Sequence, residues 1–157
     1  MSVNLKAFLD MLAWSEGTST VTGSDNGYNV LVGGTLFDSY ADHPRRKIWV
    51  GRIKDYSTAA GRYQLLARYY DFYTKQLHLP DFSPATQDEI ALEQIKECHA
   101  LSDIASGDLL SAIHKCSHIW ASLPGNNYGQ HVQAISDLTD VYIAAGGTIK
   151  PPDKEDV

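Results

Sequence analysis

An apolar stripe near the N-terminus predicts a helix with one buried face. Residues at spacings of three and four form this stripe: Leu5, Phe8, Leu9 and Leu12. These spacings bring side chains to one side of an α-helix. Glu16 follows Leu12 by four residues, so it continues the stripe. Gly17 comes next and predicts the end of the helix, because glycine readily adopts the left-handed backbone conformation that closes a helix.

A glutamate in this position is a candidate acid catalyst. Partial burial disfavours the charged form of the Glu16 carboxyl group, and the negative end of the helix dipole acts in the same direction. Both effects favour a carboxyl group that holds a proton near neutral pH, the state that a general acid needs. The alternative is a glutamate that only caps a turn or pairs with an arginine.

Four segments, spread in order over nearly the whole chain, resemble a known family. They are AFLDMLAWSEGT at 7–18, TAAGRYQLL at 58–66, FSPATQDEIALEQIKE at 82–97 and IWASLPGNNYGQ at 119–130. Together they resemble the endolysins of the phage lambda type, which have a lysozyme-like fold and act as lytic transglycosylases. The resemblance implies that Glu16, in the segment WSEGT, is the catalytic glutamate. It also implies a separate phage holin, which permeabilises the inner membrane so that the enzyme reaches the cell wall.

Two further residues are candidates for substrate binding. Gln64 follows Gly61 at a predicted helix start, and the family carries a glutamine in a comparable glycine-led segment. Tyr128 lies on a glycine-containing loop and matches the family's YGQ segment; its ring could pack on a sugar face and its hydroxyl could bond an acetamido group. The alternatives are a surface glutamine at position 64 and a buried loop anchor at position 128.

The resemblance implies cleavage of the β-1,4 bond between N-acetylmuramic acid and N-acetylglucosamine in peptidoglycan, with 1,6-anhydro ends as products. Many glycosidases use two carboxylates, and Asp25, Asp38 and Asp42 lie near a predicted hairpin, although each is also an ordinary turn residue. A hydrolytic muramidase with one of these aspartates is therefore an alternative, as is a glycan-binding module without activity.

Length and composition predict a single α+β domain. The chain has 157 residues, of which 43% are hydrophobic and 20% charged, enough for one core. Residues 1–149 form the predicted lysozyme-like domain, and the polar, proline-containing segment 150–157 is a predicted flexible tail. Helical patterns cover residues 5–16, 62–79, 84–98, 109–120 and 135–145, and a small hairpin at 28–37 is expected to flank a substrate cleft.

The charge pattern and the cysteines restrict the partners and the compartment. A formal net charge of −6 argues against nucleic acid as the main partner. Cys98 and Cys116 fall within predicted helices and are expected to be buried thiols, which agrees with synthesis in the host cytoplasm. Neither a secretory signal nor a membrane-spanning run is evident. We expect a monomer without membrane insertion, and the resemblance implies that it acts in the periplasm after membrane permeabilisation.

No cofactor or metal is expected. His114 and His118 have the spacing of two ligands on one helix face, but no third ligand and no metalloprotease pattern accompany them. A solvated histidine pair is the more common meaning of this spacing.

The role of Tyr128 can be tested with two variants. If the ring packs on a sugar and the hydroxyl bonds it, Tyr128→Phe should weaken binding of a chitooligosaccharide by roughly 0.5–1.5 kcal/mol and Tyr128→Ala by more, with little change in melting temperature. A buried structural tyrosine would instead cost about 3 kcal/mol or more of stability in Tyr128→Ala. A large drop in melting temperature with unchanged affinity for the chitooligosaccharide would identify that structural role.

Overall fold

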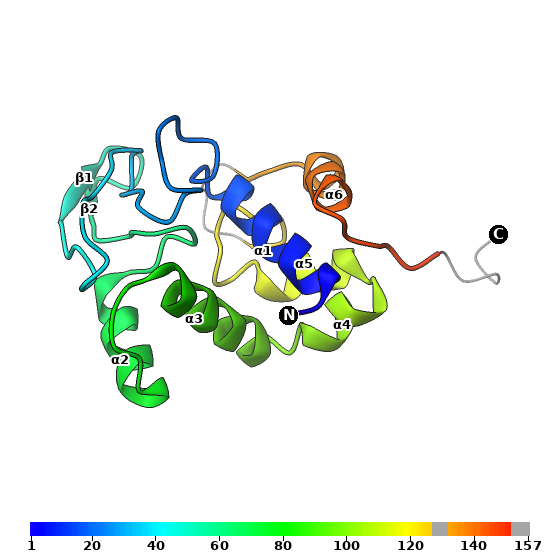
Figure 1. Ribbon diagram of the computed structural model, residues 1–157. Helices are drawn as coiled ribbons and strands as arrows, with labels where there is room; N and C mark the ends of the chain where they lie inside the picture. Colours follow the sequence, from blue (N-terminus) through cyan, green and yellow to red (C-terminus); the bar gives the residue numbers. More distant parts are fainter. Residues whose placement is uncertain (127–131, 152–157) are drawn as a thin grey trace. The chain divides into compact units, whose positions relative to one another are not determined.

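Six α-helices and one two-stranded sheet are present in residues 1–126 and 132–151, the part of the chain that the computed structural model describes (Figure 1). In chain order they are α1 Val3–Ser15, β1 Ile48–Val50, β2 Asp55–Ser57, α2 Ala67–Leu77, α3 Pro84–Glu97, α4 Leu101–Ser106, α5 Leu109–Cys116 and α6 Ile135–Ala144. The contacts group into two units, Met1–Met11 with Gln94–Val157, and Leu12–Glu93. We call these the first and the second unit. The fold is α+β, as the sequence predicts.

The end of α1 confirms the expected glycine cap. Gly17 has a φ of +75°, and its N–H donates to the Trp14 carbonyl oxygen at 2.9 Å. The Thr18 N–H donates to the Ala13 carbonyl oxygen at 3.0 Å, which completes the pair of bonds that closes many helices. Glu16 is therefore the residue at which the helix gives way to the cap.

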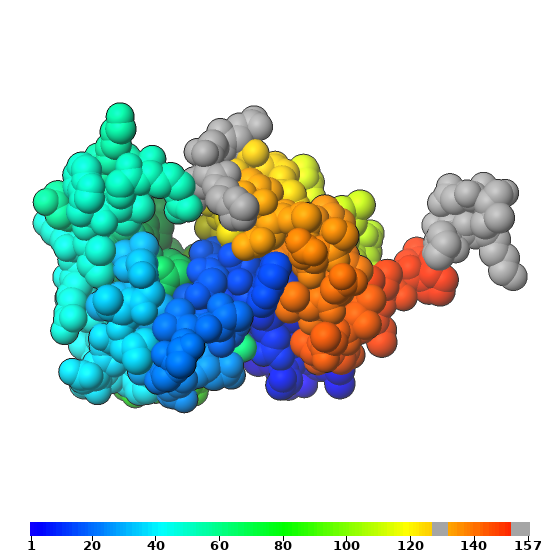
Figure 2. Space-filling view, turned by 90° about the horizontal axis from the view of Figure 1, so that it is seen from above, coloured from blue at the N-terminus to red at the C-terminus, as the bar shows by residue number. Residues whose placement is uncertain are grey.

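The small sheet lies further along the chain than the sequence predicts. Residues 28–37 do form a turn, but they contribute only an isolated antiparallel bridge between Val30 and Leu36. The sheet is instead the pairing of β1 with β2, in which Trp49 lies opposite Tyr56. The two strands form part of the second unit's exposed surface, drawn in cyan and turquoise in Figure 2. The sequence pattern did not indicate β1 and β2, because a strand of three residues is too short to show an alternation of apolar and polar residues.

The predicted helix at 62–79 begins later than expected. Residues 61–64 form a turn, and α2 starts at Ala67. Gly61 has a φ of +83° and Gln64 a φ of +54°, both outside the helical region. Tyr70 and Tyr73 are buried, whereas Tyr69 is 45% exposed.

The other helices agree with their predicted patterns. At the start of α3 the Thr86 N–H donates to the Ser83 hydroxyl, as the preference for serine at helix N-caps predicts, and Asp108 caps α5 by accepting from the Ser111 N–H. The expected inward residues are buried: Ile90, Ala91, Ile95, Leu109, Ile113, Cys116, Trp120, Leu138 and Tyr142. Ile135 and Ala145 differ, since Ile135 is 38% exposed and Ala145 is half-buried. The short helix α4 was not predicted, because six residues carry too little periodicity to detect.

An aromatic cluster forms the core of the second unit. It contains Leu31, Phe37, Ala60, Leu65, Tyr70, Tyr73, Phe82 and Ile90. The buried His43 ring packs against it, with ring centroids 4.9 Å from Phe82 and 5.6 Å from Tyr70. The cluster holds the segments before and after β1 and β2 together.

In the first unit, both cysteines are free and buried, which confirms the expected thiols. The hydrogen bond between the thiols, together with burial, raises the pKa of Cys116.

The predicted tail begins at Lys150, whose backbone N–H donates to the Gly107 carbonyl oxygen at 2.9 Å. The single domain at 1–149 and the flexible tail stay predictions. None of the described helices has the length and apolar character needed to cross a membrane.

His43 makes the stability of the second unit depend on pH. The Arg45 N–H donates to Nδ1 at 2.9 Å, so the proton of the neutral ring lies on Nε2, which is 2.8 Å from the Leu65 carbonyl oxygen. Burial lowers the pKa of His43. The unfolded chain therefore takes up a proton more readily, and the free energy of unfolding should fall as the pH drops below about 6.5, by at most about 1.4 kcal/mol per pH unit.

Urea unfolding between about pH 7 and pH 5 measures this dependence, above the range in which most carboxylates titrate. The matched variant His43→Gln has no titrating ring, so its stability should be lower at neutral pH but should change less across the range. An equally steep decrease in parent and variant would show that other groups cause it.

Candidate functional site

Three segments of the second unit meet beside the end of α1. They are residues 16–19, 26–31 and 60–65. The Thr18 side chain is 1% exposed, and its hydroxyl donates to the Arg62 carbonyl oxygen at 2.6 Å, with the Ala13 carbonyl oxygen also within 3.1 Å. This contact joins the segment of Glu16 to the segment of Gln64. Glu16 itself is half-buried.

A glycine allows the second segment to approach the first. Gly27 has a φ of +86°, and a Cβ atom at this position would lie 2.9 Å from the Thr18 hydroxyl and from the Ser19 nitrogen. Only a residue without a side chain fits such a close backbone approach. The loop after Glu16 is therefore packed directly against residue 27.

The third segment is a tight turn with bonds on both sides. Ala60 and Leu65 exchange backbone hydrogen bonds of 2.9 and 3.1 Å, and the Gly61 N–H donates to the Val30 carbonyl oxygen at 2.8 Å. Inside the turn, the Arg62 N–H donates to the Gln87 side-chain oxygen at 2.9 Å. Gln87 is 3% exposed and also donates to the Phe82 and Tyr28 carbonyl oxygens. The start of α3 thus fixes the turn that carries Gln64.

Gln64 does not lie at a helix start, and this corrects the sequence prediction. It is the last residue of the turn, and its amide nitrogen donates to the Gly61 carbonyl oxygen at 3.0 Å and to the Val30 carbonyl oxygen at 3.2 Å. The side chain is half-buried. Its oxygen makes no hydrogen bond within the described residues and is available as an acceptor. Contact with a sugar stays a prediction.

A half-buried network of charged and hydroxyl groups supports the turn, and sequence reasoning missed it. Asp88 accepts hydrogen bonds from the Tyr63 hydroxyl at 2.6 Å and from the Tyr28 hydroxyl at 2.9 Å. The Arg62 guanidinium, 4% exposed, donates to the Tyr63 hydroxyl and to the Asn26 carbonyl oxygen. It also lies over the Tyr28 ring, 5.2 Å from the centroid. Burial, followed by the Asp88 carboxylate, raises the pKa of Tyr28. In the sequence, only Gly61, directly before Arg62, indicates a turn at this position.

The three aspartates near the predicted hairpin differ in their surroundings. Asp25 accepts a hydrogen bond from the Tyr40 hydroxyl at 2.7 Å. Asp42 pairs with Arg45 at 3.0 Å, and this hydrogen bond is the main cause that lowers the Asp42 pKa. Asp38 is exposed. Asp25 and Asp42 thus each hold a loop residue, which agrees with a structural role for these two.

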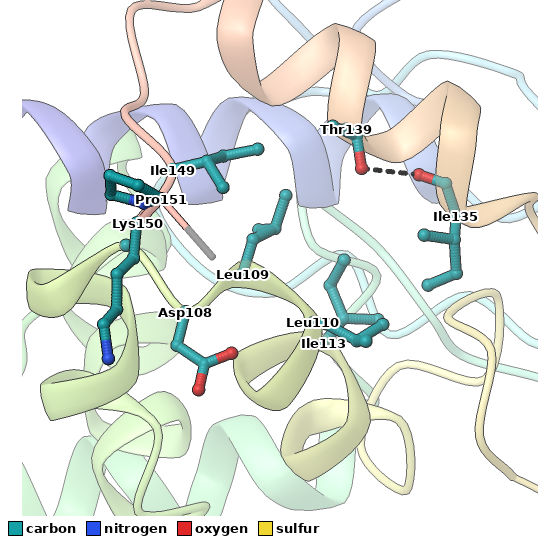
Figure 3. A pocket seen from close by; sticks show the side chains of 10 residues that line it. Asp108, Leu109, Leu110, Ile113, Ile135, Thr139, Ile149, Lys150 and Pro151 are labelled. Atoms are coloured by element: carbon teal, nitrogen blue, oxygen red, sulfur yellow. Dashed lines mark hydrogen bonds between the residues drawn. The ribbon is translucent and has the colours of Figure 1, made fainter. Parts of the chain in front are cut away.

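The remaining candidates lie elsewhere. Tyr128 falls outside the described residues. In the first unit, a cavity of about 500 Å³ has apolar side chains at its centre and Asp108 and Lys150 among its lining residues (Figure 3). It contains neither Glu16 nor Gln64. Within residues 1–126 and 132–151, no group of three or more histidine, cysteine or acidic side chains is arranged to hold a metal ion.

The comparisons with known proteins identify the family. A model of the endolysin family matches residues 6–149. The chain belongs to the endolysin family. The endolysin of Escherichia phage lambda is 53% identical over 94% of each chain, and the endolysin of Escherichia phage P2 is 46% identical over 92% of this chain and 93% of its own.

Solved structures of the endolysin family confirm the lysozyme-like fold. The structure of bacteriophage lambda lysozyme complexed with a chitohexasaccharide matches with a TM-score of 0.92 at 52% identity, covering 96% of this chain and 98% of that one. A second structure of lysozyme from bacteriophage lambda matches with a TM-score of 0.88 at 51% identity. The resemblance of the four sequence segments is therefore confirmed at the level of family and fold.

Two glycines separate backbone strain from crowding in the turn. Gly33 and Gly61 both have positive φ values, +89° and +83°, but a Cβ atom at position 33 meets nothing within 4 Å, whereas at position 61 it would lie 2.8 Å from the Phe82 ring and closer still to the Gln87 side chain. Gly33→Ala should cost roughly 1–2 kcal/mol of stability. Gly61→Ala should cost about 2 kcal/mol more, because it displaces the side chain that bonds Arg62.

Urea unfolding of both variants provides the comparison. Equal losses of stability in the two variants would mean that the crowding of the added Cβ atom at position 61 against Gln87 has no effect.

Proposed function

We propose that the chain is a phage endolysin that cleaves peptidoglycan as a lytic transglycosylase, with Glu16 as its acid and base. The observation that carries this proposal is the position of Glu16 at the capped end of α1, in a chain that belongs to the endolysin family. The relative with the chitohexasaccharide supports a β-1,4-linked glycan of N-acetylated sugars as the ligand class.

The proposed reaction needs one carboxyl group. The protonated Glu16 carboxyl gives its proton to the glycosidic oxygen as the bond to C1 of N-acetylmuramic acid breaks. The C6 hydroxyl of the same sugar then attacks C1 and gives its proton to the Glu16 carboxylate, which returns to its starting state. The products are a 1,6-anhydro end and a free 4-hydroxyl group, and no water is consumed. Because the attack is intramolecular, it has a large effective-concentration advantage over attack by a separate molecule.

The surroundings of Glu16 suit this role. The Glu16 N–H donates to the Leu12 carbonyl oxygen at 2.9 Å, and the next two residues bond Trp14 and Ala13, so the backbone that carries the carboxyl group is held on a regular element. The negative end of α1 favours the protonated form. The acetamido oxygen of the substrate could stabilise the positive charge on C1, as in substrate-assisted glycosidases.

The second candidate is a hydrolytic muramidase that pairs Glu16 with Asp25, Asp38 or Asp42. The hydrogen bond of Asp25 with Tyr40 and the ion pair of Asp42 with Arg45 speak against two of these. A glycan-binding module without activity would bind equally well after the loss of Glu16.

We also propose the setting of the reaction. The chain would be made in the host cytoplasm and act as a monomer in the periplasm, after a phage holin permeabilises the inner membrane. Neither a cofactor nor a metal takes part in the proposed steps.

The test is the variant Glu16→Gln, which preserves the shape of the side chain but cannot deliver a proton. It should stay folded and lose lysis of permeabilised Gram-negative cells, by about a hundredfold or more. Products from purified sacculi should carry anhydro ends, which weigh one water less than the reducing ends that a muramidase makes. Clearing within a few-fold of the parent rate would contradict the role of Glu16 as acid and base.

The matched controls are Asp25→Asn, Asp38→Asn and Asp42→Asn. Each should clear cells at close to the parent rate, because the substrate supplies its own nucleophile. Reducing ends as products, or one folded asparagine variant as inactive as Glu16→Gln, would replace the transglycosylase with the muramidase.

A further inference from the structure

The β1–β2 hairpin presents two aromatic rings to solvent. Trp49 and Tyr56 face each other across the strands, with ring centroids 5.3 Å apart in an edge-to-face arrangement. They are 56% and 59% exposed. Ile48, the neighbour of Trp49, points to the other face of the strand and packs against the aromatic core cluster. The exposed pair therefore contributes little to the core, and its exposure is typical of a binding surface.

Four unpaired cations lie close to this aromatic pair in the chain. Arg46 and Lys47 precede β1, and Arg52 and Lys54 lie in the turn between the strands. All four side chains are exposed, and none forms a hydrogen bond or an ion pair with another described residue. Arg45, directly before them, differs because it pairs with Asp42 and Asp71. In a chain of net charge −6, a local excess of free cations attracts anionic partners.

A cavity of about 630 Å³ lies between the hairpin and the start of α2. Lys47, directly before β1, and Tyr56 of β2 line it. So do Leu66, directly before α2, and Arg68 in the first turn of that helix. The cavity also contains one carboxylate, Asp55, whose oxygen accepts the Tyr56 N–H at 2.7 Å. Two cations with aromatic and aliphatic walls suit a short organic chain that ends in a carboxylate.

Two residues that line this cavity, Thr58 and Leu66, flank the turn of the candidate site in the chain. Thr58 bonds the Ala67 N–H through its hydroxyl at 3.0 Å. The chain between Thr58 and Leu66 is the segment that forms the turn with Gln64. A ligand in the cavity would therefore lie next to the turn on which the proposed substrate contact depends.

We propose that the cavity with Lys47 and Arg68, together with the Trp49–Tyr56 pair, binds the acidic peptide branches of peptidoglycan beside the glycan. This inference rests on the proposed function, since peptidoglycan is the polymer that carries short carboxylate-bearing peptides on its sugars. The cations recognise the peptide carboxylates, and the rings pack on the peptide backbone and its aliphatic parts. The site would thus favour glycan that carries peptides over bare glycan.

An anionic lipid surface is the other partner that cations and aromatic rings can fit. The cavity favours the peptide, because a flexible branch can enter a recess between a hairpin and a helix, whereas a layer of lipid headgroups cannot.

The test compares two substrates for the double variant Lys47→Gln/Arg68→Gln. One is intact sacculi, and the other is glycan strands stripped of peptides by an amidase. At low salt, the double variant should cleave intact sacculi roughly tenfold more slowly than the parent at limiting substrate, and should cleave the bare strands at the parent rate. Salt should reduce the difference, because it screens exposed charges.

The matched control is Lys75→Gln/Lys96→Gln, which removes two exposed cations outside the cavity. It should behave like the parent on both substrates. Co-sedimentation with both substrates in the Glu16→Gln background measures binding without cleavage, so the inference can be judged even if the parent cleaves neither substrate and the proposed function fails.

Three results would overturn the inference: no loss on intact sacculi, an equal loss on both substrates, or the same loss in the control. A fourth result would assign the surface to lipid. The parent would bind vesicles of phosphatidylglycerol and phosphatidylcholine, the double variant would not, and binding to sacculi would be the same for both.

Discussion

The hydrogen bond from the Thr18 hydroxyl to the Arg62 carbonyl oxygen is the contact on which the candidate site depends. It is buried, and it connects two segments that are 44 residues apart in the sequence. The backbone after Glu16 has no regular element to hold it once α1 ends, so its place relative to the turn at 61–64 depends on this bond and on the close approach of Gly27. An unpaired buried carbonyl would cost about 1–3 kcal/mol, which makes the bond hard to replace.

Behind this contact, the polar groups of the second unit satisfy one another. The Gln87 side chain serves three backbone groups, and Asp88 accepts from two tyrosines while Arg62 donates to one of them. Buried polar groups specify an arrangement more strongly than apolar ones, because each needs a partner in a defined direction. The network therefore positions the turn, and it leaves the oxygen of Gln64 free to accept a bond.

Features with a local cause could be predicted from the sequence. The helical stripes, the caps at Gly17 and Ser83 and the buried cysteines all follow from spacing or from one residue's chemistry. The turn at 61–64 could not be predicted in this way, because Arg62 fits the helical spacing of the tyrosines that follow. The hydrogen bonds of this turn override that local preference: Arg62 bonds Gln87 and Thr18, and Gln64 bonds Val30. The sheet was misplaced for a related reason: Gly33 and Gly34 are a strong turn signal, but the strands beside them pair only at one position.

The short length of β1 and β2 has a consequence for solubility. A sheet of two strands has an open edge on each side, and such edges can recruit strands from other molecules and start aggregation. Here each edge offers three residues, and Lys47 and Lys54 stand at the ends of the strands, where a second copy of the hairpin would bring like charges together. Both features disfavour pairing of this exposed β-structure with the same edge of another molecule.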